Sequence, residues 1–133
     1  MNSHHFHAVV WIDHHEARIF HFSPSDADKL VLHPDNPHVH IHHKVNSIGS
    51  GHAAEDQNFL DAVTKSIADA GAVLITGPAN AKAELVKHIS AHEPQLMKII
   101  TGIETVDHPS DGELVAHARK YFKVEDLMLP QKK

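Results

Sequence analysis

One short apolar run constrains the fold of this chain more than any other feature. The run Ala72-Val73-Leu74-Ile75-Thr76 begins after Gly71 and ends before Gly77-Pro78, and residues with helical spacing lie on both sides of it. A continuous apolar segment of this length is typical of a strand that is buried in a parallel sheet. We therefore expect an α/β fold in which helices cover this strand.

The N-terminal third of the chain has the pattern of strands joined by turns. Segments with strand character occupy 7–13, 16–22, 29–33 and 38–45. The tight Asp13-His14-His15 connection predicts a hairpin, and the clusters at 23–26 and 34–37 are rich in turn residues. These segments predict an antiparallel portion of the sheet.

From Ala53 onward the spacing of apolar residues changes from two to about four. Phe59, Val63 and Ile67 have this spacing, which predicts an amphipathic helix that Gly71 closes. A second helix is expected at about 79–92, a short strand at 103–106, and a third helix with Leu114, Ala118, Tyr121 and Phe122 on its buried face. Ser110 and Glu113 form a capping-box pattern at the start of that helix.

The order of these elements predicts one domain over residues 1–133, with a core at about 7–122 and a loosely held tail at 124–133. The expected architecture is a three-layer α/β fold with a mixed sheet. Its antiparallel N-terminal strands are followed by helix, strand, helix, strand and helix.

Composition excludes several classes of function. The chain has no cysteine, which excludes disulfides, zinc ribbons, iron–sulfur clusters and thiol catalysis. It also lacks a long apolar run near its start, so we expect no signal peptide, no membrane contact and a cytoplasmic location. The net charge of −5 argues against binding nucleic acid over a broad surface, although protonation of the 16 histidines would make the chain cationic at mildly acidic pH.

The histidines allow two interpretations. Four of them could place imidazoles on one face of the sheet as ligands for zinc or nickel: His33, His38, His40 and His42. The alternative is a solvated strand face, because neither a carboxylate nor a cysteine completes a diagnostic metal motif. His88 and His92 have the i, i+4 spacing of a chelating pair, but Ile89 replaces the glutamate of a zinc hydrolase, so we expect an exposed helix edge.

Two enzymatic interpretations receive little support. A two-metal nuclease would need clustered carboxylates, and the candidates are Asp13, Glu55, Asp56 and Asp111, but Thr76-Gly77 ends the strand where a carboxylate would be needed. The stretch 107–112 places Asp, His and Ser close together, yet turn and cap roles explain each residue, and catalytic triads are rarely contiguous.

Three segments together resemble a known family of translation factors. They are the run 11–20, the polar region that ends in a Gly-rich loop, and the run 72–79 followed by Lys82-x-Glu84-Leu85. This pattern is similar to the central domain of eukaryotic and archaeal class I release factors and Pelota, across roughly 7–122. Short bacterial proteins described as translational machinery proteins resemble it most closely. The resemblance implies an RNase-H-like fold and work at the ribosome.

The loop Gly49-Ser50-Gly51-His52 is where the resemblance implies function. In release factors a Gly-Gly-Gln in this loop enters the peptidyl-transferase centre, but here no Gln follows two adjacent glycines, and Gln57 falls within the predicted helix. The loop also precedes a helix N-terminus, where backbone N–H groups favour an anion such as phosphate. A flexible crossover between sheet and helix explains the same glycines without any ligand.

The leading hypothesis is a non-catalytic ribosome- or RNA-associated protein, with rRNA or tRNA as the partner and no cofactor. The contact residues would be Lys44, Ser47, Gly49, Ser50, Gly51 and His52, with His42 and His43 adding positive charge. The alternatives are a zinc- or nickel-binding protein on the same fold and a peptidyl-tRNA or ester hydrolase. Whether the chain forms a homodimer through an exposed strand is left open.

Overall fold

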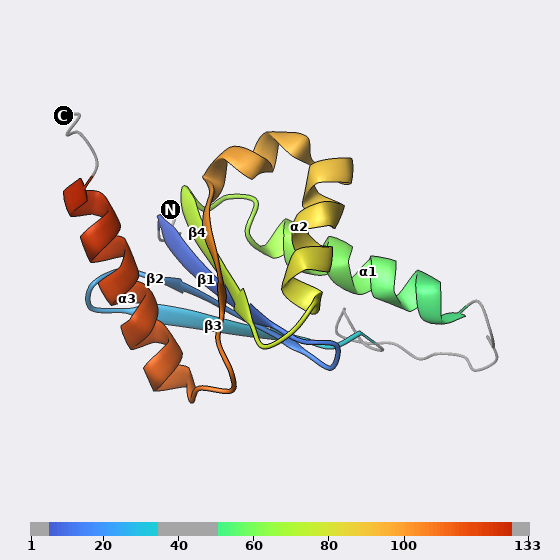
Figure 1. Cartoon of the computed structure of the whole chain (residues 1–133), viewed down its shortest axis with the longest axis horizontal. Coiled ribbons are helices and arrows are strands. Elements are labelled where there is room, and N and C mark those ends of the chain that lie inside the picture. The colour runs from blue at the N-terminus through green and yellow to red at the C-terminus, as the bar shows by residue number, and fades with distance from the viewer. Residues whose placement is uncertain (1–5, 35–50, 129–133) are drawn as a thin grey trace.

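The computed structural model describes residues 6–34 and 51–128, which form a layered α/β structure (Figure 1). Its elements in chain order are β1 (His7–Ile12), β2 (Ala17–Phe22), β3 (Ala27–Leu32), α1 (Gly51–Ser66), β4 (Ala72–Gly77), α2 (Ala81–His92), the 3-10 helix η1 (Pro94–Ile99), β5 (Ile100–Thr105) and α3 (Asp111–Met128). Among these described residues, no helix is both long enough and apolar enough to cross a membrane.

The five strands form one mixed sheet in the order β3-β2-β1-β4-β5. β1 pairs antiparallel with β2, and β2 pairs antiparallel with β3. β4 runs parallel to both β1 and β5, so it lies in the interior of the sheet as its apolar run predicts. The expected α/β fold with an antiparallel N-terminal portion is confirmed.

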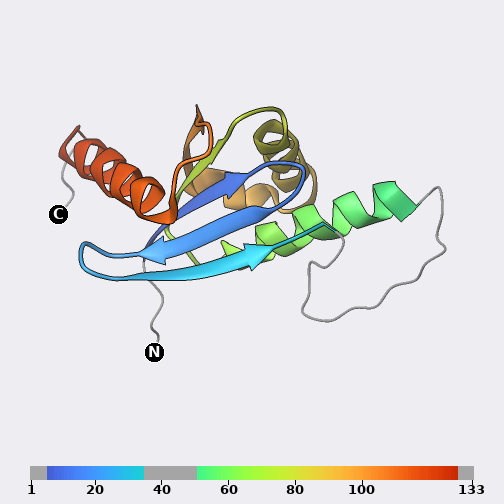
Figure 2. The same cartoon turned by 90° about the horizontal axis from the view of Figure 1, so that it is seen from below.

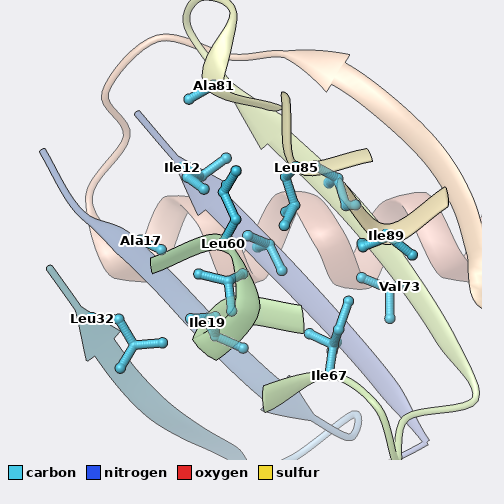
Figure 3. Close-up of a cluster of buried hydrophobic side chains, with 14 of the residues drawn as sticks. Ile12, Ala17, Ile19, Leu32, Leu60, Ile67, Val73, Ala81, Leu85 and Ile89 are labelled. Atoms are coloured by element: carbon cyan, nitrogen blue, oxygen red, sulfur yellow. The ribbon is translucent and has the colours of Figure 1, made fainter. Parts of the chain in front are cut away.

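Helices cover both faces of the sheet, which gives three layers (Figure 2). α1 and α2 pack on one face, where their apolar side chains meet alternate residues of the strands (Figure 3). The fully buried members of this cluster include Ile12, Ile19, Val63, Ile67, Ile75, Leu85 and Ile89. Because both sides are covered, every residue of β4 is buried.

α3 covers the opposite face of the sheet. Its apolar stripe packs against the residues of β1, β2 and β4 that point away from α1, including Val9, Trp11, Phe20, Phe22 and Leu74. Leu114, Ala118 and Phe122 are buried as expected, and Tyr121 is half-buried. The Tyr121 hydroxyl donates to the carbonyl of Thr101 on β5 at 3.0 Å, which ties this helix to the edge of the sheet.

Two contacts fix the ends of the parallel strands. The buried hydroxyl of Thr76 donates to the carbonyl of Val10 at 2.8 Å and so joins β4 to β1 by a side chain. Gly77 lies so close to β1 that a Cβ atom there would be 2.2 Å from the carbonyl oxygen of Ile12. Only glycine permits this approach of two backbones.

Several boundaries differ from those predicted. β3 begins at Ala27 rather than at residue 29, because the turn closed by Ser23 N and Asp26 O returns the chain to pairing at once. β5 begins at Ile100, directly after η1, which the sequence pattern did not predict. α3 continues to Met128, so the segment expected to be a tail from 124 begins as helix. The strand expected at 38–45 lies outside the described residues.

Candidate functional site

The predicted contact loop falls partly outside the described residues. Lys44, Ser47, Gly49 and Ser50 belong to the part that the structure does not describe. Gly51 and His52, which we expected in the loop, are instead the first two residues of α1. The backbone from Gly51 onward is therefore helical, and the described part of the candidate site is the N-terminal end of α1.

The N-terminal turns of α1 extend beyond the end of the sheet, as Figures 1 and 2 both show. The helix is held by its other half, where Phe59, Leu60 and Val63 are buried against the sheet and α2. The apolar spacing in the sequence therefore indicates the C-terminal half of α1 as the part that packs on the sheet. The predicted loop residues Gly51 and His52 are at the N-terminal end of α1.

A buried histidine joins α1 to α2. The sequence pattern indicated an exposed helix edge at His88 and His92, and this expectation is wrong for His88, which is 7% exposed. The Nδ1 atom of His88 lies 3.1 Å from the side-chain oxygen of Gln57, and its Nε2 lies 3.8 Å from a carboxylate oxygen of Asp61. Both partners are on α1, so the contact holds the two helices together.

The electrostatics of this junction favour a neutral imidazole. Burial lowers the pKa of His88 below its usual value, and neighbouring His92, with its ring centre 4.3 Å away, lowers it further, while Asp61 acts in the opposite direction. A hydrogen bond from Lys65 is the main cause of the lowered pKa of Asp61. With Nε2 too far from Asp61 for a hydrogen bond, Nδ1–H donating to Gln57 is the tautomer that the geometry favours.

The metal hypothesis gains no support from the part of the chain that is described. His33 is exposed, and its Nδ1 lies 3.2 Å from the backbone carbonyl of His15. His38, His40 and His42 lie outside the described residues. Among the side chains that the structure describes, those of 6–34 and 57–123, no three acidic, histidine or cysteine residues are grouped so that they could hold a metal ion.

The acidic residues near the carboxyl ends of the parallel strands have structural partners. One oxygen of Asp13 accepts hydrogen bonds from the backbone N–H groups of His15 and Glu16, and its other oxygen lies 3.7 Å from Nε2 of His108. Asp111 forms ion pairs with Arg18 and Lys29. Glu55 and Asp56 lie in α1, and the structure does not describe their side chains. Asp13 and Asp111 therefore serve the turn and the helix end.

The residues at 107–112 also serve structure. The backbone N–H of Ser110 donates to Glu113 at 2.9 Å, and the N–H of Glu113 donates to the Ser110 hydroxyl at 3.1 Å, which is the reciprocal capping box that the sequence predicted. His108 lies against the ring of Trp11 and pairs with the exposed carboxylate of Asp107. The serine acts as a helix cap.

Solved structures of other proteins contain the same architecture. A crystal structure of Archaeoglobus fulgidus Pelota matches with a TM-score of 0.60 and 10% identity over 86% of this chain and 30% of that one. The archaeal translation termination factor aRF1 matches with a TM-score of 0.54 and 16% identity over 92% of this chain and 38% of the other. The chain shares their fold.

A third structure extends the set to a eukaryotic protein. Dom34 of S. cerevisiae, described as a translation termination-like factor involved in RNA quality control pathways and interacting with Hbs1, matches with a TM-score of 0.52 and 11% identity over 93% of this chain. The chain spans only 30% to 38% of the length of these three structures. No protein-family model matches the chain, and no curated protein sequence matches it significantly. At these identities the likeness shows the fold.

Sequence reasoning missed the junction that positions α1. The i, i+4 pair His88 and His92 gave a signal, but spacing on one helix cannot say which face another helix covers. Gln57 was set aside as a residue within the predicted helix, and it does lie in α1, where it contacts His88. Only the packing of α1 across α2 brings these two side chains together.

Proposed function

We propose that this chain is a non-catalytic ribosome- or RNA-associated protein of the translation-factor type. The observation that carries the proposal is the match of 86% to 93% of the chain to structures of Pelota, aRF1 and Dom34. Since this chain matches only 30% to 38% of the length of those proteins, the proposal concerns the part of their work that this fold alone could do.

The proposed contact is the segment 44–52 at the N-terminal end of α1. This placement is supported by the helix that extends beyond the sheet and begins at Gly51. Lys44 and His52 would supply charge to RNA phosphate, and the glycines would permit close approach of the backbone. Since the net charge is −5, the contact must be local, and its affinity should fall as salt rises.

The absence of the Gly-Gly-Gln sequence supports a role without hydrolysis. We also propose that the chain belongs with the short bacterial translational machinery proteins and works in the cytoplasm. Its partner would be ribosomal RNA or tRNA within a ribosome or a subunit.

Co-sedimentation tests this function. Purified chain is mixed with ribosomes or isolated subunits at low salt, pelleted through sucrose and quantified, using ribosomes from growing and from stressed cells. We expect the chain in the pellet, with its share falling as salt rises. Failure to sediment with any of these particles at low salt would overturn the proposal.

A matched pair of charge reversals tests the assignment to the loop. Lys44→Glu should weaken ribosome binding by about fivefold or more, because it replaces a phosphate contact by a repulsion. Lys120→Glu makes the same change of charge on α3, on the opposite face of the sheet, and should bind as the parent does. Equal losses in both variants would remove the loop from the contact.

A hydrolysis assay tests the non-catalytic part of the proposal. We expect no turnover of a peptidyl-tRNA or a model peptidyl ester by the purified chain. Turnover that His52→Ala abolishes would replace this part of the proposal by an ester-hydrolase function.

A further inference from the structure

A groove lies between α3 and the end of the sheet where β1 begins and β2 ends. Its volume is about 420 Å³. It is lined by His7, Phe22 and Pro24 from the sheet side and by Arg119, Phe122 and Lys123 from α3. Sites for small molecules commonly have volumes of roughly 300–1,000 Å³. The groove is separate from the segment 44–52 and from the junction at His88, and the proposed function makes no use of it.

Three rings form the base of the groove. The imidazole of His7 contacts two phenylalanines, and its ring centre is 4.5 Å from that of Phe122 and 5.9 Å from that of Phe22. The two phenylalanines are 5.9 Å apart, and each is 3% exposed, so they are held firmly in the core. The half-buried imidazole of His7, held in place by these two buried rings, therefore offers a flat ligand a surface that needs little reordering.

Two cations lie at the rim of this aromatic base. Nε of Arg119 donates to the carbonyl of Ser23 at 2.9 Å, and its Nη2 donates to the carbonyl of Asp26 at 3.0 Å, so the position of the guanidinium is fixed. Both acceptors are neutral backbone groups, which leaves the positive charge of Arg119 uncancelled by these contacts. Lys123, one turn later on the same face of α3, is exposed.

The charge of the lining is one-sided. Among the described residues that line the groove, two are cationic and none carries a carboxylate. An aromatic base with positive charge on one rim is complementary to a ligand that has a flat apolar body and an oxyanion at one end. A neutral apolar ligand would make no ionic contact with the two cations. A bare inorganic anion would make no contact with the rings.

We propose that this groove binds a small aromatic anion, whose ring packs against His7 and Pro24 and whose carboxylate, sulfonate or phosphate group meets Lys123 and Arg119. The proposal does not depend on the ribosomal function, since the ligand is a free small molecule. The ring contacts supply contact area, and the two cations set the orientation.

The test uses 1-anilinonaphthalene-8-sulfonate, an aromatic sulfonate whose fluorescence rises when it binds. Titration of the purified full chain should give saturable binding at one site. Lys123→Glu should weaken it by about fivefold or more, because an attraction to the sulfonate becomes a repulsion. Lys120→Glu, which makes the same change of charge three residues earlier on α3, should leave the affinity unchanged within about twofold.

Two further measurements make the outcome decisive. N-phenyl-1-naphthylamine, which lacks the sulfonate, should bind more weakly and should not distinguish the two lysine variants. In amide NMR spectra of the full chain, the sulfonate probe should shift the signals of His7, Ser23, Phe122 and Lys123 most. Equal affinities of the two variants, or shifts concentrated elsewhere in the fold, would overturn the proposal.

Discussion

Arg18 on β2 donates a hydrogen bond through Nη1 to the carboxylate of Asp111, 93 residues later, at 2.8 Å. The Arg18 side chain is 11% exposed, its Nη2 donates to the carbonyl of Pro109, and its guanidinium carbon lies 4.6 Å from the centre of the Trp11 ring. Hydrogen bonds from Lys29 and Arg18 hold the pKa of Asp111 below its usual value. This pair fixes the start of α3 on the sheet.

Removing the carboxylate should therefore destabilise the fold. Asp111→Ala removes the closer of the two carboxylates that pair with the largely buried Arg18 guanidinium and leaves Glu16, 3.6 Å from Nε, which should cost about 2 kcal/mol in the free energy of unfolding. Urea unfolding measures this cost. Asp107→Ala is the control, since its carboxylate is 93% exposed and its carbonyl still accepts the indole N–H of Trp11. A cost as small as that of Asp107→Ala would show that the ion pair does not stabilise the fold.

Two glycines should respond in opposite directions to alanine. Gly77→Ala places a Cβ atom 2.2 Å from the carbonyl oxygen of Ile12, so β1 and β4 must separate, and we expect a loss of roughly 2–4 kcal/mol. Gly112→Ala meets nothing within 4 Å and lies in α3, so it should stabilise the chain by about 0.5 kcal/mol. Thermal or urea unfolding of the two variants checks both signs. A neutral Gly77→Ala variant would contradict the close approach of the strands.

The capping box at the start of α3 should contribute a measurable part of the stability. Ser110→Ala removes the acceptor of the Glu113 N–H and should cost about 1 kcal/mol in the free energy of unfolding. Ser110→Asp keeps an acceptor at the cap and should retain most of that energy. Urea unfolding followed by circular dichroism should therefore rank the stabilities as parent, Ser110→Asp and Ser110→Ala, from highest to lowest. An alanine variant as stable as the parent would rule out a contribution from the cap.

The junction at His88 should make stability depend on pH. The lowered pKa of His88 means that the fold holds its imidazole neutral more strongly than the unfolded chain does. The stabilisation is therefore complete above the unfolded pKa of about 6.5 and is lost as the pH falls below it. Between pH 7.5 and 5.5 the parent should lose more stability than His88→Gln, which cannot be protonated.

The control for this prediction is another histidine. His15→Gln removes an exposed histidine of the β1–β2 turn, and this variant should lose about as much stability as the parent over the same change of pH. Because each variant is compared with itself at two pH values, a constant cost of the substitution does not affect the result. Identical pH dependence in the parent and in His88→Gln would contradict the prediction.

The layers of the fold could be predicted because they depend on local patterns. The run 72–76 indicated a buried strand, and the four-residue spacing of Phe59, Val63 and Ile67 indicated the helix that covers it. The capping box at Ser110 was predictable for the same reason, since both of its partners lie within one turn. Elements with less apolar patterning, such as the start of β3 at Ala27, were placed less well.

The contacts between elements could not be predicted in this way. His88 looked like a surface residue because histidine is polar and the helix has other polar faces, yet α1 packs across it. The ion pair of Arg18 with Asp111 joins residues far apart in sequence, and no local pattern relates them. The contact loop rested on family resemblance, and most of its residues lie outside the described part of the chain.

The placement of α1 sets the distance between the body of the protein and the first turn of that helix. Six residues separate Gly51 from Gln57, where the contact with His88 begins, and a helix rises about 1.5 Å per residue, so the first turn lies roughly 9 Å beyond that contact. Deleting one residue in this interval would shorten the reach by about 1.5 Å and rotate the end by about 100°. The number of residues in this interval therefore sets both the distance and the direction of the start of α1 relative to the body of the protein.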